Sequence, residues 1–227
     1  MSDLPLSLSL PLILFYLTVL VLAAEGLNRL TDTHGEFTRK IVHIGSGNVV
    51  LLAWWLQIPT TIGIGAAIVA GMIALLSYSV PILPSLNSVG RKSLGTFFYA
   101  VSFGVLFACF WTKYPEFTVI GILIMAWGDG LAAVVGQRFG QHPYEIFGGK
   151  KSLEGSLTMF LVSFLMAGLI LSNTQGNPLS SWGIALVVAM VATGLESFSW
   201  LGIDNLLVPL GSTFCAFYLS RIIILTN

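Results

Sequence analysis

Apolar stretches of about 20 residues recur along almost the whole chain, and short segments between them carry most of the charge. A helix needs about 20 apolar residues to cross the roughly 30 Å hydrocarbon core of a bilayer. Of the 227 residues, 56% are hydrophobic and only 9% are charged, whereas soluble domains carry roughly 25% charged residues. Such a surface is too apolar for water, so the sequence predicts an all-α integral membrane protein without a soluble domain.

About eight stretches are long enough to be transmembrane helices, and the pattern is also compatible with seven or nine. The first run is longer than the roughly 7–15 apolar residues of a signal peptide and has no basic segment before it, so we interpret it as a retained helix. No shift in composition marks a domain boundary, and residues 1–227 are expected to form a single membrane domain. The candidate spans are Leu6–Gly26, Ile41–Leu56, Thr60–Val80, Thr96–Trp111, Phe117–Gln137, Ser156–Leu171, Trp182–Ser199 and Leu206–Ile224.

Basic residues are unevenly divided between the two sides that these spans define. Eight of the ten lie in the odd-numbered loops, namely Arg29, Arg39, Lys40, Arg91, Lys92, Arg138, Lys150 and Lys151. Only Lys113 and Arg221 lie on the other side. Short loops rich in lysine and arginine remain in the cytoplasm. The sequence therefore predicts cytoplasmic odd-numbered loops and places both termini on the opposite side of the membrane.

Most acidic residues and all histidines fall on the same predicted cytoplasmic face. They are Glu25, Asp32, His34, Glu36, His43, Asp129, His142, Glu145, Glu154, Glu196 and Asp204. We therefore expect the reactive groups in three segments, roughly 26–43, 128–156 and 196–209. The net charge is zero, which gives no reason to expect nucleic acid as a partner. Cys109 and Cys215 lie in apolar runs without ligand spacing and are interpreted as packing residues.

Asp129 stands in an otherwise apolar run, Trp127-Gly128-Asp129-Gly130, where an ionisable group is costly and usually functional. Small residues at Ala133, Gly136 and Gly140 share its helical face, so a neighbouring helix or a ligand can approach closely. A carboxylate in this place suits Mg²⁺, which takes one or two protein carboxylates together with water and phosphate oxygens. The alternative is a structural ion pair between Asp129 and a basic residue of another helix.

The segment from Phe147 to Ser156 combines glycines, two lysines and the start of a helix. Exposed backbone N–H groups, positive charge and a helix N-terminus together favour polyphosphate binding. The segment is not a Walker A loop, because Tyr144 replaces the first glycine of that motif and Lys151 replaces its hydroxyl residue. A positively charged loop that only sets the topology is the alternative interpretation.

Two further groups flank the predicted site. Arg39 and His43 are one helical turn apart, and Arg39 or Lys40 can bind a phosphate, although a basic pair at a helix end also has a topological explanation. Glu196 follows a long uncharged run, and Asp204 either caps the last helix or joins the site. Asp129, Glu196 and Asp204 suffice to hold one or two Mg²⁺ ions, and one of them can serve instead as the base.

These motifs together resemble the phytol kinase branch of the CTP-dependent polyprenol and diacylglycerol kinases. The resemblance rests on Arg39-Lys40-x-x-His43, the Gly-Asp pair at Asp129, the run from Gly148 to Ser156, and Glu196 followed by Asp204-Asn205-Leu206-x-x-Pro209. It covers most of the chain, from Arg39 to Pro209. Each motif alone is weak, whereas four in the same order are fairly specific. The Lys-Ser-x-Glu-Gly segment is also similar to phosphatidate cytidylyltransferases, but the C-terminal signature of that family is missing.

The resemblance implies CTP as phosphoryl donor, Mg²⁺, and a lipid alcohol such as phytol as acceptor, with farnesol, dolichol or diacylglycerol as alternatives. In an oxygenic phototroph such an enzyme would salvage phytol for tocopherol synthesis. Asp129, Lys151, Glu154, Glu196 and Asp204 are the candidate catalytic residues, with Asp129, Glu196 and Asp204 as metal ligands. Glu154 is expected to orient Lys151 or complete the metal shell. The candidate nucleotide-binding residues are Arg39, Lys40, His43, Gly148, Gly149, Lys150, Lys151, Ser152 and Asn205.

Two rival functions come from other classes. A CTP:phosphatidate cytidylyltransferase would release pyrophosphate instead of CDP. A transporter would place its binding residues near the bilayer midplane and often shows repeated halves; here the charges lie at one interface and no repeat is visible. The kinase interpretation requires Asp129 and the Lys150–Lys151 turn to meet in space, with the alcohol approaching along the small-residue face of the fifth helix. Oligomeric state cannot be inferred from the sequence.

Overall fold

The structure is a computed structural model that describes residues 4–30, 35–79, 94–146, 149–198 and 201–226. Most of these residues are helical. In chain order the elements are α1 (Leu6–Leu30), α2 (Gly35–Gly47), α3 (Val49–Trp55), α4 (Thr60–Ser79), α6 (Gly95–Leu106), η1 (Phe107–Trp111), α7 (Pro115–Leu123), η2 (Ile124–Asp129), α8 (Gly130–Phe139), β1 (Pro143–Ile146), β2 (Gly149–Ser152), α9 (Leu153–Gln175), α10 (Pro178–Ser197) and α11 (Asp204–Thr226). The segments η1 and η2 are π-helical.

Each of the eight predicted spans coincides with one helix or with consecutive helical segments. Within the described ranges, six helices are long and apolar enough to cross a membrane: Leu6–Asn28, Thr60–Ser77, Pro115–Phe139, Leu153–Gln175, Pro178–Ser197 and Asp204–Ile223. The two spans expected near the short limit form α2–α3, which is interrupted at Asn48, and the shorter apolar helix Gly95–Trp111. The predicted fold class, an all-α membrane protein of about eight helices, is confirmed.

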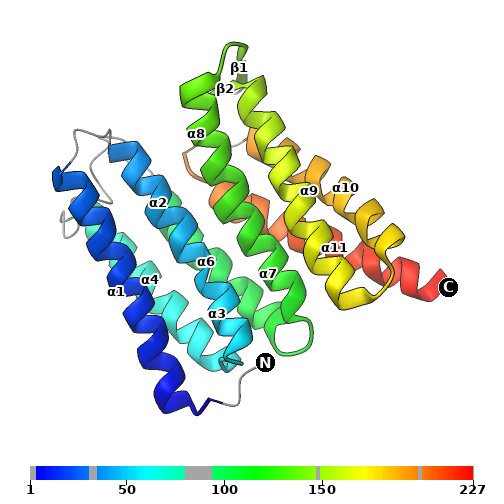
Figure 1. Ribbon diagram of the computed structural model, residues 1–227, viewed down its shortest axis with the longest axis horizontal. Coiled ribbons are helices and arrows are strands. Elements are labelled where there is room, and N and C mark those ends of the chain that lie inside the picture. The colour runs from blue at the N-terminus through cyan, green and yellow to red at the C-terminus, as the bar shows by residue number, and fades with distance from the viewer. Residues whose placement is uncertain (1–3, 31–34, 80–93, 147–148, 199–200, 227) are drawn as a thin grey trace.

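The segments α7, η2 and α8 continue one another and form the central helix of the bundle (Figure 1). Of the window Pro115–Phe139, 67% is buried, compared with 6% of Leu6–Asn28. Helices α2, α9 and α11 contact the central helix directly, whereas α1 packs at the periphery against α2 and α3. Asp129, at the end of η2, therefore faces protein and not lipid.

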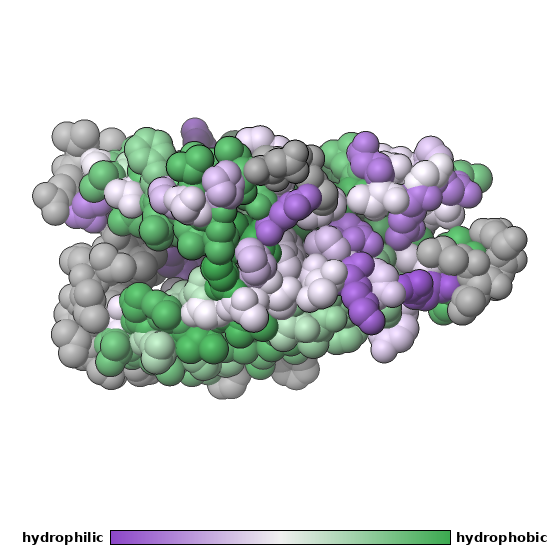
Figure 2. Space-filling model, turned by 90° about the horizontal axis from the view of Figure 1, so that it is seen from below, coloured by the Kyte–Doolittle hydropathy of each residue, from purple (hydrophilic) through white to green (hydrophobic). Residues whose placement is uncertain are grey.

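The outer surface of the helices is apolar, as expected for a protein surrounded by lipid. On α9 the exposed leucines recur every four residues, with exposed fractions between 48% and 59%: Leu153, Leu157, Leu161, Leu165 and Leu169. Seen from below, apolar residues cover large areas along both long edges of the molecule, and hydrophilic residues gather towards the middle and right (Figure 2). A continuous apolar stripe of this length on a helix is stable in hydrocarbon, and in water it would favour aggregation.

A two-stranded antiparallel sheet between α8 and α9 adds a feature that the sequence did not predict. In its register Tyr144 pairs with Lys151 and Glu145 pairs with Lys150. The hairpin stands at the same end of the bundle as the start of α2, opposite the start of α1 (Figure 1). It brings the two lysines of the predicted phosphate segment to that end on a strand, and not on an irregular glycine loop.

The small-residue face of α8 is occupied by another helix along part of its length. A Cβ atom at Gly136 would lie 3.0 Å from Ser152 Oγ, and one at Gly155 would lie 3.0 Å from the carbonyl oxygen of Ala132. These glycines therefore allow α8 and the start of α9 to approach each other closely. Of the two uses expected for this face, the structure shows helix packing at Gly136 and Gly140, so the alcohol cannot run along that part of α8.

Candidate active site

Asp129 is the last residue of η2 and is almost completely buried. Its Oδ2 atom accepts a hydrogen bond from Lys40 Nζ on α2 at 2.6 Å, and both side chains are 9% exposed. The alternative of an ion pair with a neighbouring helix is therefore present in the structure. It does not explain the position by itself, because π-helical turns such as η2 occur frequently at functional sites.

His43 lies one turn after Lys40 on α2 and also faces Asp129. Its Nε2 atom is 3.1 Å from the carbonyl oxygen of Met125 and 3.4 Å from Asp129 Oδ2. A carbonyl oxygen only accepts, so Nε2 carries the hydrogen and donates it to Met125. Asp129 Oδ2 is a close neighbour of the same N–H group, and Nε2 is not a base for a substrate proton.

Tyr99 on α6 fixes the imidazole from the other side. Its hydroxyl donates to the carbonyl oxygen of His43 at 2.8 Å, and its ring meets the imidazole edge to face at a centroid distance of 4.7 Å. Asp129 Oδ2 thus has one hydrogen-bond donor, Lys40, and one close N–H neighbour, His43, whereas no hydrogen bond reaches Oδ1 among the described residues. The carboxylate is oriented before any ligand binds, which is how a rigid site reduces the cost of reaching a reactive geometry.

A second ion pair joins the hairpin to α10. Lys151 Nζ donates to Glu196 Oε1 in a short contact, and the side chain of Glu196 is 5% exposed. Tyr144, opposite Lys151 in the register, lies within hydrogen-bond distance of Ser156 on α9 (2.6 Å) and of Ser197 on α10 (3.1 Å). The hairpin is therefore docked on both helices, and Lys151 points inward.

Electrostatic interactions connect the two ion pairs into one cluster. Burial lowers the pKa of Lys151, but the attraction of Glu196, its hydrogen bond, and the further attraction of Asp129 and Asp204 together raise that pKa above its usual value. Lys151 is thus a cation at neutral pH. Asp129 is therefore near enough for its charge to act on Lys151. That one triphosphate can touch both residues stays a prediction.

The strand conformation separates residues that the sequence grouped together. Side chains alternate along a strand, so Lys150 points away from Lys151 and is exposed. Gly149 belongs to strand β2, and Ser152 Oγ accepts from Gly155 N at 3.1 Å as the N-cap of α9. The segment Gly149–Ser152 is thus a strand and not an irregular loop, and phosphate binding by its backbone N–H groups stays a prediction. Gly148, Asp32, His34, Arg91 and Lys92 lie outside the described residues.

Glu154 occupies a different place from the one predicted. Its Oε1 atom lies 2.7 Å from His142 Nδ1, and the two side chains are on the exposed side of the hairpin base. The orientation of Lys151 comes instead from Glu196. The expectation that Glu154 orients Lys151 is thus replaced by a pair that closes the hairpin onto α9.

The remaining predicted residues lie at the edges of the cluster. Asp204 begins α11 and accepts a hydrogen bond from the backbone N–H of the next residue, Asn205, at 3.0 Å. The Oδ1 atom of Asn205 is buried without a hydrogen-bond partner in the described part of the chain. Arg39 lies one turn before His43 on α2. Roles for Arg39, Lys40, His43 and Asn205 in nucleotide binding stay predictions.

A magnesium site fits the available oxygens only in part. The described residues contain no group of three or more His, Cys, Asp or Glu side chains close enough to hold a metal ion. Mg²⁺ needs only one or two protein carboxylates when phosphates and water supply the other ligands. Asp129 Oδ1 meets that smaller requirement, whereas Glu196 is bound to Lys151. A metal role for Glu196 or Asp204 stays a prediction.

Sequence reasoning missed Tyr99, Tyr144 and the carbonyl of Met125. Tyrosines are common near membrane interfaces, so neither tyrosine stood out from the pattern. The Met125 carbonyl that accepts from His43 belongs to the π-helical turn η2, and no residue type in the sequence indicates such a turn. These groups position the predicted residues and were visible only after folding.

Comparison with known proteins identifies the family of this chain. The chain is 56% identical over 214 residues to the phytol kinase of Synechocystis sp., covering 94% of this chain and 92% of that protein. The chain belongs to the phytol kinase family. It is 30% identical to phytol kinase 1, chloroplastic, of Arabidopsis thaliana (88% of this chain, 72% of that protein). It is likewise 30% identical to the probable phytol kinase, chloroplastic, of Triticum aestivum (88% and 73%).

Membership of the phytol kinase family confirms the resemblance that the ordered motifs indicated. No family model matches the chain, and no solved structure matches it.

Proposed function

We propose that this protein is a phytol kinase that transfers the γ-phosphoryl group of CTP to the hydroxyl of phytol. The new bond joins the alcohol oxygen to the γ-phosphorus, the bond from that phosphorus to the β–γ bridging oxygen breaks, and CDP leaves. The alcohol proton passes to a carboxylate of the site. The products are phytyl monophosphate and CDP. The relatives named phytol kinase and the buried ion pair of Asp129 with Lys40, within the electrostatic influence of Lys151, support this proposal.

The observation that carries the proposal is the cluster of Asp129, Lys40, Lys151 and Glu196 at one end of the helices. Phosphoryl transfer depends mainly on positioning and on neutralising the charge of the transferred group. Lys40, from the start of α2, contacts Asp129 directly, and Lys151, from the docked hairpin, lies near enough for its charge to interact with that of Asp129. A buried cation acts strongly on a nearby phosphate because the local dielectric constant is low.

Bound Mg²⁺ would supply further charge neutralisation at the phosphates. In this proposal Asp129 Oδ1 is its protein ligand, because Oδ2 already accepts from Lys40 and lies close to His43. Lys151 exchanges part of its contact with Glu196 for a phosphate oxygen, and the carboxylate of Glu196 is then able to accept the alcohol proton. The unpartnered Oδ1 of Asn205 is an acceptor for a donor group of the bound nucleotide.

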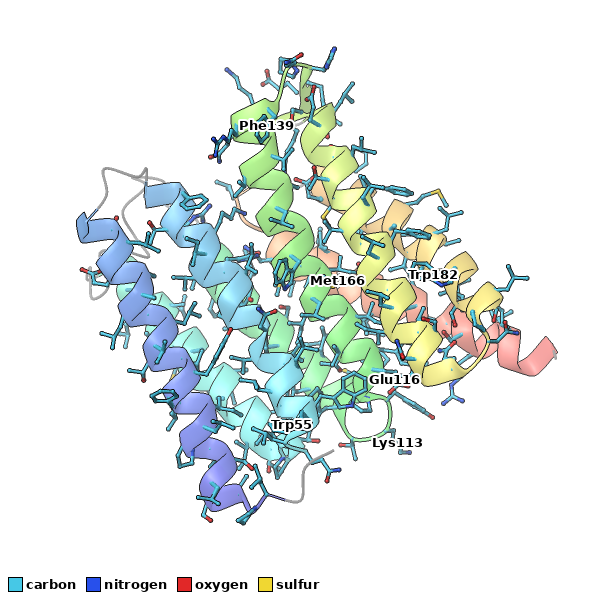
Figure 3. All side chains as sticks on the ribbon, in the orientation of Figure 1. Trp55, Lys113, Glu116, Phe139, Met166 and Trp182 are labelled. Atoms are coloured by element: carbon cyan, nitrogen blue, oxygen red, sulfur yellow. The ribbon has the colours of Figure 1, made fainter. Side chains whose placement is uncertain are left out.

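Active face and termini are assigned by the same proposal. The hairpin end is cytoplasmic because the basic residues favour that side, and both termini face the opposite compartment. Lys113 and Glu116 lie at the end opposite Phe139 and the hairpin (Figure 3). At that end Arg221 stacks over Tyr114 at 4.4 Å, which gives one of the few basic residues there a place in the fold.

The test is an assay of the purified protein in phosphatidylcholine vesicles with Mg²⁺ and each of the four nucleoside triphosphates. Phytol, farnesol, dolichol and diacylglycerol are offered as acceptors, and both nucleotide and lipid products are analysed. We expect phytyl monophosphate and CDP, with CTP preferred. Pyrophosphate and a CDP-lipid would instead identify a cytidylyltransferase, and the absence of any phosphorylated alcohol would reject the kinase.

Asp129→Asn tests the central residue within the same assay. The variant should be recovered folded and should lose at least about 100-fold in turnover, since one amide cannot replace a metal-binding or proton-accepting carboxylate. Glu116→Gln is the matched control, because Glu116 is a half-buried carboxylate at the opposite end of the same helix span. Asp129→Asn with turnover close to that of the control would refute the role of Asp129.

A further inference from the structure

An apolar cavity of about 400 Å³ opens between the helices. Its aliphatic walls are Leu51 and Leu52 on α3, Leu123 on α7 and Met166 on α9. Met166 lies roughly midway between the end marked by Phe139 and the end marked by Lys113 (Figure 3). Cavities of this size are typical of sites for small molecules.

The polar groups at the cavity are largely engaged with each other. Tyr16 donates its hydroxyl to the carbonyl oxygen of Gly45 at 2.8 Å. Trp127 donates its indole N–H to Asn48 Oδ1 at 2.7 Å. With these donors satisfied, the walls offer mainly apolar surface, so the cavity suits a hydrocarbon chain and not a nucleotide or a polar solute.

The cavity lies beside the active-site segment but on the other side of η2. Trp127 points to the cavity, whereas Asp129, two residues later, points to Lys40 and His43. Ile44 on α2 packs against Gly130, the residue after Asp129, since a Cβ there would lie 2.5 Å from Ile44 Cγ1. Trp127 and Asp129 are two residues apart on η2, so a chain seated in the cavity ends close to the segment that carries the carboxylate.

We propose that this cavity binds the isoprenoid chain of the alcohol substrate and thereby selects its length. The proposal rests on the kinase function, because only a lipid substrate needs a hydrocarbon site within one helical turn of Asp129. An engineered cavity of about 150 Å³ binds benzene, so 400 Å³ holds on the order of 15 carbon atoms by the same ratio. A chain of four isoprene units fills the cavity, and its distal end extends into lipid.

Tryptophan substitutions that fill the cavity from two sides test the proposal. Met166→Trp and Leu52→Trp should raise the KM for phytol by about 10-fold or more, as the loss of several buried methylene contacts predicts. The KM and kcat for the ten-carbon alcohol geraniol should change less than the KM for phytol, by about threefold at most, since ten carbon atoms fill only about two-thirds of the cavity and leave space for part of the added ring. Retained turnover of geraniol also shows that the variants are folded.

Leu165→Trp is the matched control, because Leu165 precedes Met166 on α9 but is 50% exposed on the leucine stripe. It should leave the kinetics with both alcohols unchanged. Equal kinetics of Met166→Trp, Leu52→Trp and Leu165→Trp with phytol would overturn the assignment of the cavity.

A photoreactive diazirine analogue of phytol gives a readout that does not depend on turnover. In phosphatidylcholine vesicles it should label Leu51, Leu52 or Met166, and unlabelled phytol should compete. Labelling confined to the outer leucines of α9, or labelling without competition, would identify an ordinary lipid-facing surface and overturn the proposal. If unlabelled phytol competes with the labelling but the protein phosphorylates no alcohol, the cavity is still a binding site and only the kinase function is rejected.

Discussion

Removing the cation that holds Asp129 gives the sharpest test of how the site is built. Lys40→Met keeps most of the side-chain volume but deletes the charge 2.6 Å from Asp129 Oδ2. At that distance two unit charges attract by about 6 kcal/mol with an effective dielectric constant of 20. Desolvation of both groups offsets part of this attraction, and breaking a buried pair by removing one partner costs about 3–5 kcal/mol. Because both side chains are 9% exposed, solvent screens the pair little.

Reversible unfolding in a detergent mixture measures the effect. Lys40→Met should lower the free energy of unfolding by about 3–5 kcal/mol, because it leaves an unpaired carboxylate buried. The double variant Lys40→Met/Asp129→Asn removes both charges and should recover to within about 1–2 kcal/mol of the wild type, the usual cost of an imperfectly paired buried amide. The loss in free energy of unfolding for Asp129→Asn alone should lie between those of Lys40→Met and the double variant, because the flexible stem of Lys40 lets its charge reach polar surroundings.

The pattern of the four proteins decides the outcome, since the coupling between the two sites is the quantity of interest. Additive losses from Lys40→Met and Asp129→Asn would mean that the residues do not form a buried pair, and the described geometry of the site would be wrong. Strong coupling together with loss of turnover in both single variants would show that one contact serves stability and catalysis.

Three further outcomes follow from the same cluster. Tyr144→Phe removes the hydroxyl near Ser156 and Ser197, and should slow turnover by about 10-fold through a loosened hairpin while the free energy of unfolding changes by only about 1 kcal/mol. The pKa of Lys151 is raised in the folded protein. Lys151 is therefore fully charged below the unfolded-state lysine pKa of about 10.4 and loses its charge only as the pH rises through the higher folded-state pKa. Turnover measured against pH should show no alkaline loss from this group below about pH 10. Glu154→Gln should reduce turnover by less than about threefold, because exposed pairs such as that with His142 contribute little; a large loss would restore Glu154 to the catalytic residues.

The helices were predictable because the bilayer imposes one strong requirement on the sequence. Every spanning segment must satisfy its backbone hydrogen bonds internally and present apolar side chains, so length and hydropathy suffice to locate it. Asp129 was predictable for the same reason, since an ionisable residue within an apolar helix is conspicuous. The exposed leucines of α9 are explained by contact with lipid alone, so their pattern indicates nothing about the site.

The partners of the site residues were not predictable, because they depend on tertiary packing. Lys40 and Lys151 both looked like phosphate ligands in the sequence, and the structure pairs them with Asp129 and Glu196. The two adjacent lysines were expected to act together, but the hairpin turns Lys150 outward by strand alternation. The sequence of residues 143–152 does not predict a hairpin, because the glycines of this segment are equally compatible with a loop.

The wide turn of η2 makes the geometry of the site depend on the number of residues as well as on their kinds. A π-helical turn contains one residue more than the α-helical turn it replaces. Deleting a single residue between Ile124 and Gly128 would convert the segment to a regular helix and rotate everything before it by about 100° relative to Asp129. Leu123 and Trp127 would then leave their present neighbours although each side chain was retained. Families that carry such a turn are thus constrained in spacing at this point, and alignments that open a gap here should be read as a change in architecture.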